Sequence, residues 1–267
     1  MSSTVYIPKT KYLKQVIRSI WQTNYQTRYQ HEIIIPKGIV EIIFDLGDSA
    51  PIQSTIYTKH FQLPKCFING FNTHPIQIKL PEHHFFFGVQ FHPIAIKDFF
   101  KVPASEFSNL AIDLTLLSPS FNYLWHQLAE AKTFDERVLI ISKWLETKII
   151  ETQPRDILLN SFLENNNPHT TIKELSDTVF YSPRHVSRKI SEHTGMNSEQ
   201  FLLYKKYLHA VHLMHHTELS LTEIAHDSNF TDQSHFTKTF KTFTQITPKE
   251  YRQNKGFVPG HINKDVR

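Results

Sequence analysis

The pattern of apolar and polar positions changes near residue 155, and the two parts of the chain predict different kinds of structure. Before this point, short apolar runs rich in β-branched and aromatic residues predict strands at residues 33–35, 39–46, 66–71, 75–80 and 85–91. The last run alternates with a period of two at Phe85, Phe87, Val89 and Phe91, which is typical of a half-buried strand. Several short strands at this spacing predict a barrel or a sandwich.

Helical patterns follow the strands at residues 93–101, 120–131 and 133–150. The third helix opens with Thr133 and Glu136, which have the spacing of a capping box. Its apolar residues recur at helical spacing at Phe134, Val138, Ile141, Leu145 and Ile149. This stripe either packs on the strands or pairs with its copy in a homodimer. Residues 1–154 are therefore predicted to form a mainly-β, barrel-like domain with trailing helices.

The second half of the chain contains an internal repeat. The segment Thr171-Ile-Lys-Glu-Leu-Ser returns 49 positions later as Ser220-Leu-Thr-Glu-Ile-Ala, and both copies are capping boxes that open a short apolar helix. After the turn of each copy the offset becomes 50, with matched positions 186/236, 187/237, 188/238, 190/240, 194/244, 196/246 and 201/251. A register of about thirty positions with one insertion indicates two copies of one unit.

Each unit is a short helix, a tight turn and a second helix, which is the helix-turn-helix pattern. The turn residues Ser182 and Thr231 are each predicted to cap the second helix, and Pro183 suits its first position. In this motif the second helix lies in the major groove of DNA. Apolar stripes that face the core of the units are predicted at Val186, Ile190, Phe236 and Phe240.

The other faces of the two second helices carry polar residues that suit DNA. Arginine and glutamine make paired hydrogen bonds to guanine and adenine, and lysine neutralises phosphate. The predicted DNA-binding residues are Arg184, Ser187, Arg188, Lys189, Gln233, Ser234, His235, Lys238 and Lys241. Either helix alone could be an ordinary amphipathic helix with a solvated face, but two copies in register favour the DNA-binding interpretation.

A long helix is predicted between the units, at residues 197–216, with Ser198 as its cap. Its roughly 18 residues span about 27 Å, close to the separation of about 34 Å between successive major-groove faces. A single chain could therefore read two adjacent segments of the major groove. These units and the helix define an all-α DNA-binding domain at residues 155–255, followed by a tail at 256–267, so that the whole chain is of the α+β class.

This C-terminal region resembles the DNA-binding domain of the AraC/XylS family of transcriptional regulators. The resemblance rests on Gly195-Met196, Ile224-Ala225, Asn229-Phe230-Thr231-Asp232-Gln233-Ser234-His235-Phe236, Phe240-Lys241 and Thr247-Pro248-Lys249-Glu250-Tyr251-Arg252. It implies sequence-specific DNA binding and favours activation of transcription, with RNA polymerase as a further partner. The base-reading positions of the family fall on Arg184, Ser187, Arg188, Gln233, Ser234, His235 and Lys238.

Three departures from the family pattern bear on affinity rather than on the fold. Asn229 stands where the family usually has glycine, and asparagine tolerates a positive φ better than most residues. Gln245 replaces another glycine, and Lys205-Lys206 stand where arginine is common. The N-terminal half resembles, more loosely, the β-barrel sensor or dimerisation domain that precedes such DNA-binding domains.

Composition is compatible with this interpretation without carrying it. The 267 residues have a net charge of +4, and residues 155–267 contain 14 Lys and Arg against 12 Asp and Glu, a difference of only +2. DNA affinity must therefore come from where the basic residues lie. One cysteine excludes a disulfide framework. The start of the chain has no signal-peptide pattern, and its apolar runs are far shorter than a membrane span, so we expect a cytoplasmic protein without membrane contact.

The sequence predicts no catalytic residue, metal site or cofactor, and hence no enzyme. Glycine-rich phosphate loops and hydrolase motifs are absent, and the histidines at 60, 74, 83, 84 and 92 lack a metal-ligand spacing. The first 154 residues hold 22 of the 34 aromatic residues. These rings either line a site for a small apolar effector or simply form the core.

Two alternatives to a sensor joined to a DNA binder remain. In one, the protein binds DNA constitutively and its N-terminal domain only dimerises. In the other, the same module is fused to a DNA-repair enzyme with a cysteine methyl acceptor. The single Cys66 lies in Pro64-Lys65-Cys66-Phe67 without a neighbouring histidine, which disfavours the repair enzyme.

Overall fold

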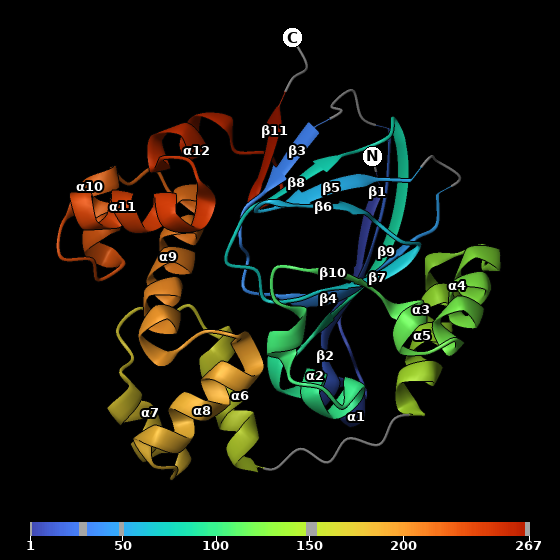
Figure 1. The fold of residues 1–267 in the computed structure, drawn as a ribbon, viewed down its shortest axis with the longest axis horizontal. Coiled ribbons are helices and arrows are strands. Elements are labelled where there is room, and N and C mark those ends of the chain that lie inside the picture. Colours follow the sequence, from blue (N-terminus) through green and yellow to red (C-terminus); the bar gives the residue numbers. More distant parts are fainter. Residues whose placement is uncertain (1, 27–30, 48–50, 148–153, 265–267) are drawn as a thin grey trace.

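Two antiparallel sheets make up most of the N-terminal half of the computed structural model, which describes residues 2–26, 31–47, 51–147 and 154–264 (Figure 1). In the first sheet the strand order is β1 (Ser2–Tyr6), β2 (Ile17–Gln26), β9 (His83–Phe91), β4 (Val40–Asp45), β7 (Cys66–Asn69) and β10 (Ala111–Asp113). In the second it is β11 (His261–Lys264), β3 (His31–Ile34), β8 (Ile76–Lys79), β5 (Gln53–Ile56) and β6 (Lys59–Gln62).

The strands form two sheets and not a closed barrel: among the described residues each sheet has two edge strands. The mainly-β, barrel-like fold with trailing helices is thus confirmed, and its strands are divided between two sheets. The central strands β4 and β9 pair in register from Val40 and Phe91 to Asp45 and Phe86. Five of their side chains are fully buried: Val40, Ile42, Phe44, Phe87 and Val89.

Short helices pack around the sheets, as Figure 1 shows. They are α1 (Lys11–Val16), α2 (Pro93–Phe100), the 3-10 helix η1 (Ala104–Phe107), α3 (Leu114–Leu117), α4 (Ser120–Glu130) and α5 (Phe134–Glu146). The capping box of Thr133 and Glu136 at the start of α5 is confirmed, since each side chain bonds the backbone of the other residue.

The apolar stripe of α5 is covered within this chain. Ile141 and Leu145 are fully buried, and Trp144 packs its ring against Phe99 and Phe121 at centroid distances of 5.3 and 5.0 Å. Ile149 lies outside the described residues. The described part of the stripe therefore packs against side chains of this chain, and the homodimer stays a prediction.

The C-terminal half is helical, as predicted, with one later strand. Its helices are α6 (Pro154–Glu164), α7 (Ile172–Val179), α8 (Pro183–Thr194), α9 (Ser198–His216), α10 (Leu221–Asp227), α11 (Gln233–Thr244) and α12 (Pro248–Asn254). The repeated unit appears as α7–α8 and α10–α11, with α9 between them (Figure 1). None of the described helices is long and apolar enough to cross a membrane.

Backbone conformation repeats together with the sequence. Phe180 and Asn229 lie in the turn after the first helix of each unit with φ of 55° and 60°, and Gly195 and Gln245 follow the second helix with φ of 76° and 62°. The left-handed region is favourable for glycine and costly for most other residues. Asn229 therefore adopts the conformation for which the family uses glycine, as expected.

Two helix caps differ from the sequence prediction. Asp232, not Thr231, caps α11 by accepting a hydrogen bond from the N–H of His235. Asn197, not Ser198, caps α9. A cap reaches the N–H three residues ahead; hence Asp232 matches the cap of α8, Ser182, at an offset of 50, because the extra residue of the second copy lies before the cap.

The long helix α9 is docked on the N-terminal half. The Tyr204 hydroxyl accepts a hydrogen bond from Gly38 N (3.0 Å) and donates one to Asn72 O (2.9 Å), and Tyr207 donates to Pro36 O (2.9 Å). Gly38 has a φ of 68°, and a Cβ at this position would lie 2.7 Å from Leu208 Cδ1. Only glycine thus permits this close approach of the strand connection to α9.

The end of the chain joins the second sheet. The segment expected to be a tail contains β11, which pairs antiparallel with β3 from His261 opposite Ile34 to Lys264 opposite His31. The carboxylate of Glu32 lies 2.7 Å from His261 Nδ1. The C-terminal half is therefore attached to the sheets both through α9 and through a strand.

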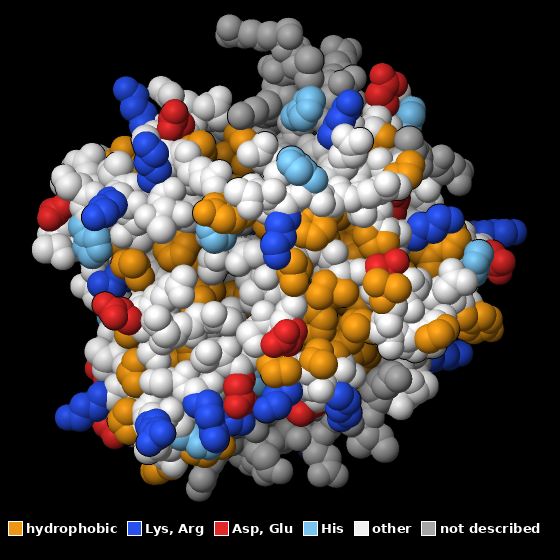
Figure 2. Space-filling view, in the orientation of Figure 1, with side chains coloured by type: hydrophobic (Ala, Val, Ile, Leu, Met, Phe, Trp, Pro, Cys, Tyr) orange, Lys and Arg blue, Asp and Glu red, His pale blue; other side chains and the backbone are white. Residues whose placement is uncertain are grey.

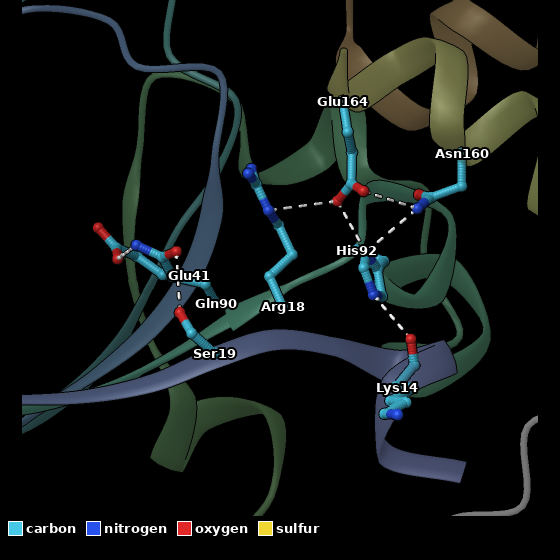
Figure 3. Close-up of polar contacts among 8 residues, drawn as sticks. All are labelled: Lys14, Arg18, Ser19, Glu41, Gln90, His92, Asn160 and Glu164. Atoms are coloured by element: carbon cyan, nitrogen blue, oxygen red, sulfur yellow. Dashed lines mark hydrogen bonds and ion pairs between the residues drawn. The ribbon is translucent and has the colours of Figure 1, made fainter. Parts of the chain in front are cut away.

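A third attachment holds α6 (Figure 3). Glu164 Oε1 lies 2.7 Å from His92 Nδ1 and 3.6 Å from Arg18 Nε, and Asn160 donates to the other carboxylate oxygen at 3.0 Å. The second nitrogen of His92 lies 3.0 Å from Lys14 O. Residues of α1, β2, α6 and the end of β9 meet here, so that α6 is attached to the N-terminal half.

Candidate nucleic-acid interface

The first candidate recognition helix, α8, has its orientation fixed by its apolar side. Ser182 caps it by accepting from the N–H of His185, and Pro183 occupies its first turn, as predicted. Val186 and Ile190 are fully buried. Because these two residues face the core, the helical period turns Arg184 and Arg188 outward, where both are exposed. Ser187 and Lys189 lie at the sides of the helix and are half-buried.

The second candidate recognition helix, α11, is built in the same way with larger side chains. Phe236 and Phe240 are buried, and their rings pack against Phe230 and Tyr251 at centroid distances of 5.3 and 5.8 Å. Its predicted DNA-binding residues are exposed, apart from the half-buried His235, namely Gln233, Ser234, Lys238 and Lys241. Burial of the aromatic face therefore leaves the opposite face polar.

Two of these side chains have contacts that orient them. Thr222 Oγ1, on α10, donates a hydrogen bond of 2.9 Å to Gln233 Oε1. The His235 ring stands edge-on to Phe230 at a centroid distance of 5.4 Å. Contacts of this kind reduce the conformational freedom that a side chain loses on binding.

Arg188 lies next to a small network of charges. Its Nη2 is 3.2 Å from His185 Nδ1, and its Nε is 3.9 Å from Glu192 Oε1, one helical turn further on. The other oxygen of Glu192 accepts a hydrogen bond of 3.0 Å from Lys97, on α2. Burial by itself raises the pKa of Glu192, but the hydrogen bond and charge of Lys97, with smaller effects of His193 and Arg188, hold it below its ordinary value. Glu192 is therefore a carboxylate at neutral pH.

The predicted residues form two groups and not one. Those of α8 and those of α11 lie in units on either side of α9, whose 19 residues span about 28 Å. Figure 2 shows Lys and Arg side chains over α8 at the lower left and around α10–α12 at the upper left, mixed with Asp and Glu. The basic residues are thus distributed over both units.

Sequence reasoning missed residues that contact the predicted DNA-binding side chains or their neighbours. Glu192 could have been found, because it stands four positions after Arg188 on the same helix. Thr222 and Lys97 gave no signal, since they act across a turn and across 95 residues of chain, respectively.

The described part of the chain offers little support for a metal site, a reactive cysteine or a ligand cavity. It contains no group of three or more His, Cys, Asp or Glu side chains arranged to hold a metal ion. Cys66 is buried, and burial, with the nearby charge of Asp113, raises its thiol pKa to about 12. A protonated, inaccessible thiol is a poor nucleophile, which argues against a methyl acceptor. A cavity between Ile34, Asn69 and Ile76 has a volume of about 10 Å³, room for about one water molecule.

Comparisons with known proteins support the helical region in particular. Residues 175–254 match the family model described as a helix-turn-helix domain, and residues 5–113 match that of a domain of unknown function (DUF6597). An uncharacterized HTH-type transcriptional regulator of Staphylococcus aureus (strain MSSA476) is 35% identical over 85 residues. The HTH-type transcriptional activator RhaS of Enterobacter sp. (strain 638) is 32% identical over 81 residues.

These matches cover a minor part of each relative. The aligned segments are 32% of this chain and 11% of the staphylococcal protein, and 30% of this chain and 29% of RhaS. Among solved structures, ToxT from Vibrio cholerae is similar over 88% of this chain and 98% of its own, with a TM-score of 0.49 and 10% identity.

Proposed function

We propose that this protein is a sequence-specific DNA-binding regulator of transcription of the AraC type that acts as an activator, because residues 175–254 match a helix-turn-helix domain. The observation that carries the proposal is the repeated unit itself. In both copies the apolar side of the second helix is buried, and the opposite side presents exposed side chains that suit DNA.

The two recognition helices read bases and contact the backbone with different residues. Arginine, glutamine, serine and histidine on their outward faces make hydrogen bonds to base edges, and lysine contacts phosphate or a base. The base-reading residues are Arg184, Ser187, Arg188, Gln233, Ser234, His235 and Lys238, and the phosphate contacts come from Lys189 and Lys241.

A single chain engages two adjacent segments of the major groove. The support is α9, whose length of about 28 Å approaches the separation of about 34 Å between groove faces. Residues 155–255 carry this activity. Residues 1–154 act as a sensor for a small molecule or as a dimerisation domain, and titration of promoter occupancy with candidate ligands distinguishes these roles. RNA polymerase is the expected partner of activation.

Selection of binding sites from random duplexes tests the proposal with the full-length chain. We expect one enriched motif, bound with an affinity that falls steeply as salt rises, because phosphate contacts release counterions. The Arg188→Ala variant should lose about 1–3 kcal/mol on the selected site and relax the preference at one base pair. The Lys241→Ala variant should weaken all duplexes alike and reduce the salt slope by about one charge.

Two outcomes contradict the proposal. An affinity that does not depend on salt, or a failure to enrich any motif at low salt, removes the DNA-binding role. Identical motifs for the wild type and for Arg188→Ala remove only the base-reading role of Arg188.

A further inference from the structure

The N-terminal half touches the first recognition helix close to its predicted base-reading residues. Helix α2 packs against α8, and Lys97 Nζ lies 3.0 Å from Glu192 Oε2. Nearby, Ser108 Oγ donates to Thr194 O at 3.4 Å, at the end of α8. The contact therefore involves the last turns of α8 and leaves its first turns exposed.

Lys97 and Arg188 both approach the carboxylate of Glu192. Lys97 holds one carboxylate oxygen at 3.0 Å, whereas the Arg188 Nε is 3.9 Å from the other, at the outer limit of an ion pair. Arg188 keeps 64% of its side chain exposed. A carboxylate four positions after an arginine on a helix is within its reach, and a paired guanidinium–carboxylate contact uses the same donors that recognise guanine.

We propose that Lys97 is a positioning residue for DNA recognition, which binds Glu192 and thereby leaves the guanidinium of Arg188 available to a base. This inference rests on the proposed function. Without Lys97, the carboxylate of Glu192 turns to Arg188 and pairs with the guanidinium donors that would otherwise bind a base. A residue of the N-terminal half thus sets the specificity of a helix in the C-terminal half.

The test uses the full-length chain, the duplex selected by the wild type, and duplexes in which the base pair sensitive to Arg188→Ala is replaced. The Lys97→Met variant should bind the selected duplex about three- to tenfold more weakly and discriminate less at that base pair. Lys97→Arg keeps the charge and should restore both properties. In a Glu192→Gln background, Lys97→Met should have no effect, since the competing carboxylate is gone.

Lys101→Met is the matched control, because it removes the same charge from an exposed position directly after α2. It should leave the discrimination unchanged, and circular dichroism should show that all variants are folded. An equal loss for Lys97→Met and Lys101→Met overturns the inference in favour of general charge.

Two further results would also overturn it. A uniform loss on every duplex, with a salt slope lower by about one charge, would mean that Lys97 contacts phosphate directly. Unchanged discrimination in Lys97→Met would mean that Glu192 does not compete for Arg188. Failure of the wild type to select any duplex is a different result, which rejects the proposed function itself.

Discussion

Lys205 lies on the buried side of α9, with only 1% of its surface exposed. Its Nζ donates hydrogen bonds to Phe162 O, Asn165 O and Asn165 Oδ1 at 2.5, 2.6 and 2.9 Å. These oxygens lie at the end of α6, where the last carbonyls of a helix lack partners within it. Lys205 therefore ties α6 to the long helix.

The stability that Lys205 provides should depend on pH. Burial lowers the pKa of Lys205 to about 7, whereas an unfolded lysine titrates at about 10.4. Between these values the unfolded chain binds a proton that the folded chain has lost, and such a difference raises stability as the pH rises. In urea unfolding, the free energy of unfolding of the wild type should therefore rise relative to that of Lys205→Met from about pH 7 to about pH 10. The rise should be at most about 1.4 kcal/mol per pH unit.

Lys249→Met, at an exposed position, serves as the control and should show no such trend. A difference between the wild type and Lys205→Met that stays constant over this range would mean that the carbonyl oxygens keep the ammonium charged despite its burial.

At the scale of elements, two adjacent polar residues at the start of α9 have different roles in capping the helix. Asn197 Oδ1 accepts a hydrogen bond of 2.8 Å from Gln200 N, whereas the hydroxyl oxygen of Ser198 is buried without a partner. Loss of a cap costs about 0.5–2 kcal/mol. Asn197→Ala should therefore lower the free energy of unfolding by this amount, and Ser198→Ala should leave it unchanged or raise it. Equal losses for both variants in urea unfolding would show that the hydroxyl also takes part in capping.

At the scale of the whole molecule, β11, near the end of the chain, should stabilise the N-terminal half. A chain ending at Gly256 loses the pairing of β11 with β3 and the buried Ile262. Together these contacts are worth about 2–5 kcal/mol. All three tryptophans lie before residue 150, so their fluorescence reports on the N-terminal half. The urea midpoint that it measures should fall in the truncated chain.

Phe257→Ser is the control for this truncation, since Phe257 is 98% exposed and its loss should not move the midpoint. If the truncated chain unfolds at the same urea concentration as the full chain, β11 is not part of the cooperative unit.

The sequence alone determined those features of the protein that depend on neighbours a few residues apart. The capping boxes at Thr171 and Ser220 and the stripes at Val186 and Phe236 follow from hydrogen bonds and helical periods that extend over one or two turns. The doubling of this pattern predicted both helix-turn-helix units and the helix between them. The candidate DNA-binding residues follow from the same stripes, because burial of one side of a helix decides which side remains exposed.

Tertiary structure alone decided what depends on residues distant in the chain. Side chains of this chain cover the apolar stripe of α5, the strands divide into two sheets, and the end of the chain becomes a strand of the second sheet. Lys97 and Glu192 meet across 95 positions, and Glu32 and His261 across 229. Periodicity shows only that one face of an element is apolar, and residue type shows only that a side chain is charged. What covers that face, or neutralises that charge, is set by packing of the whole chain.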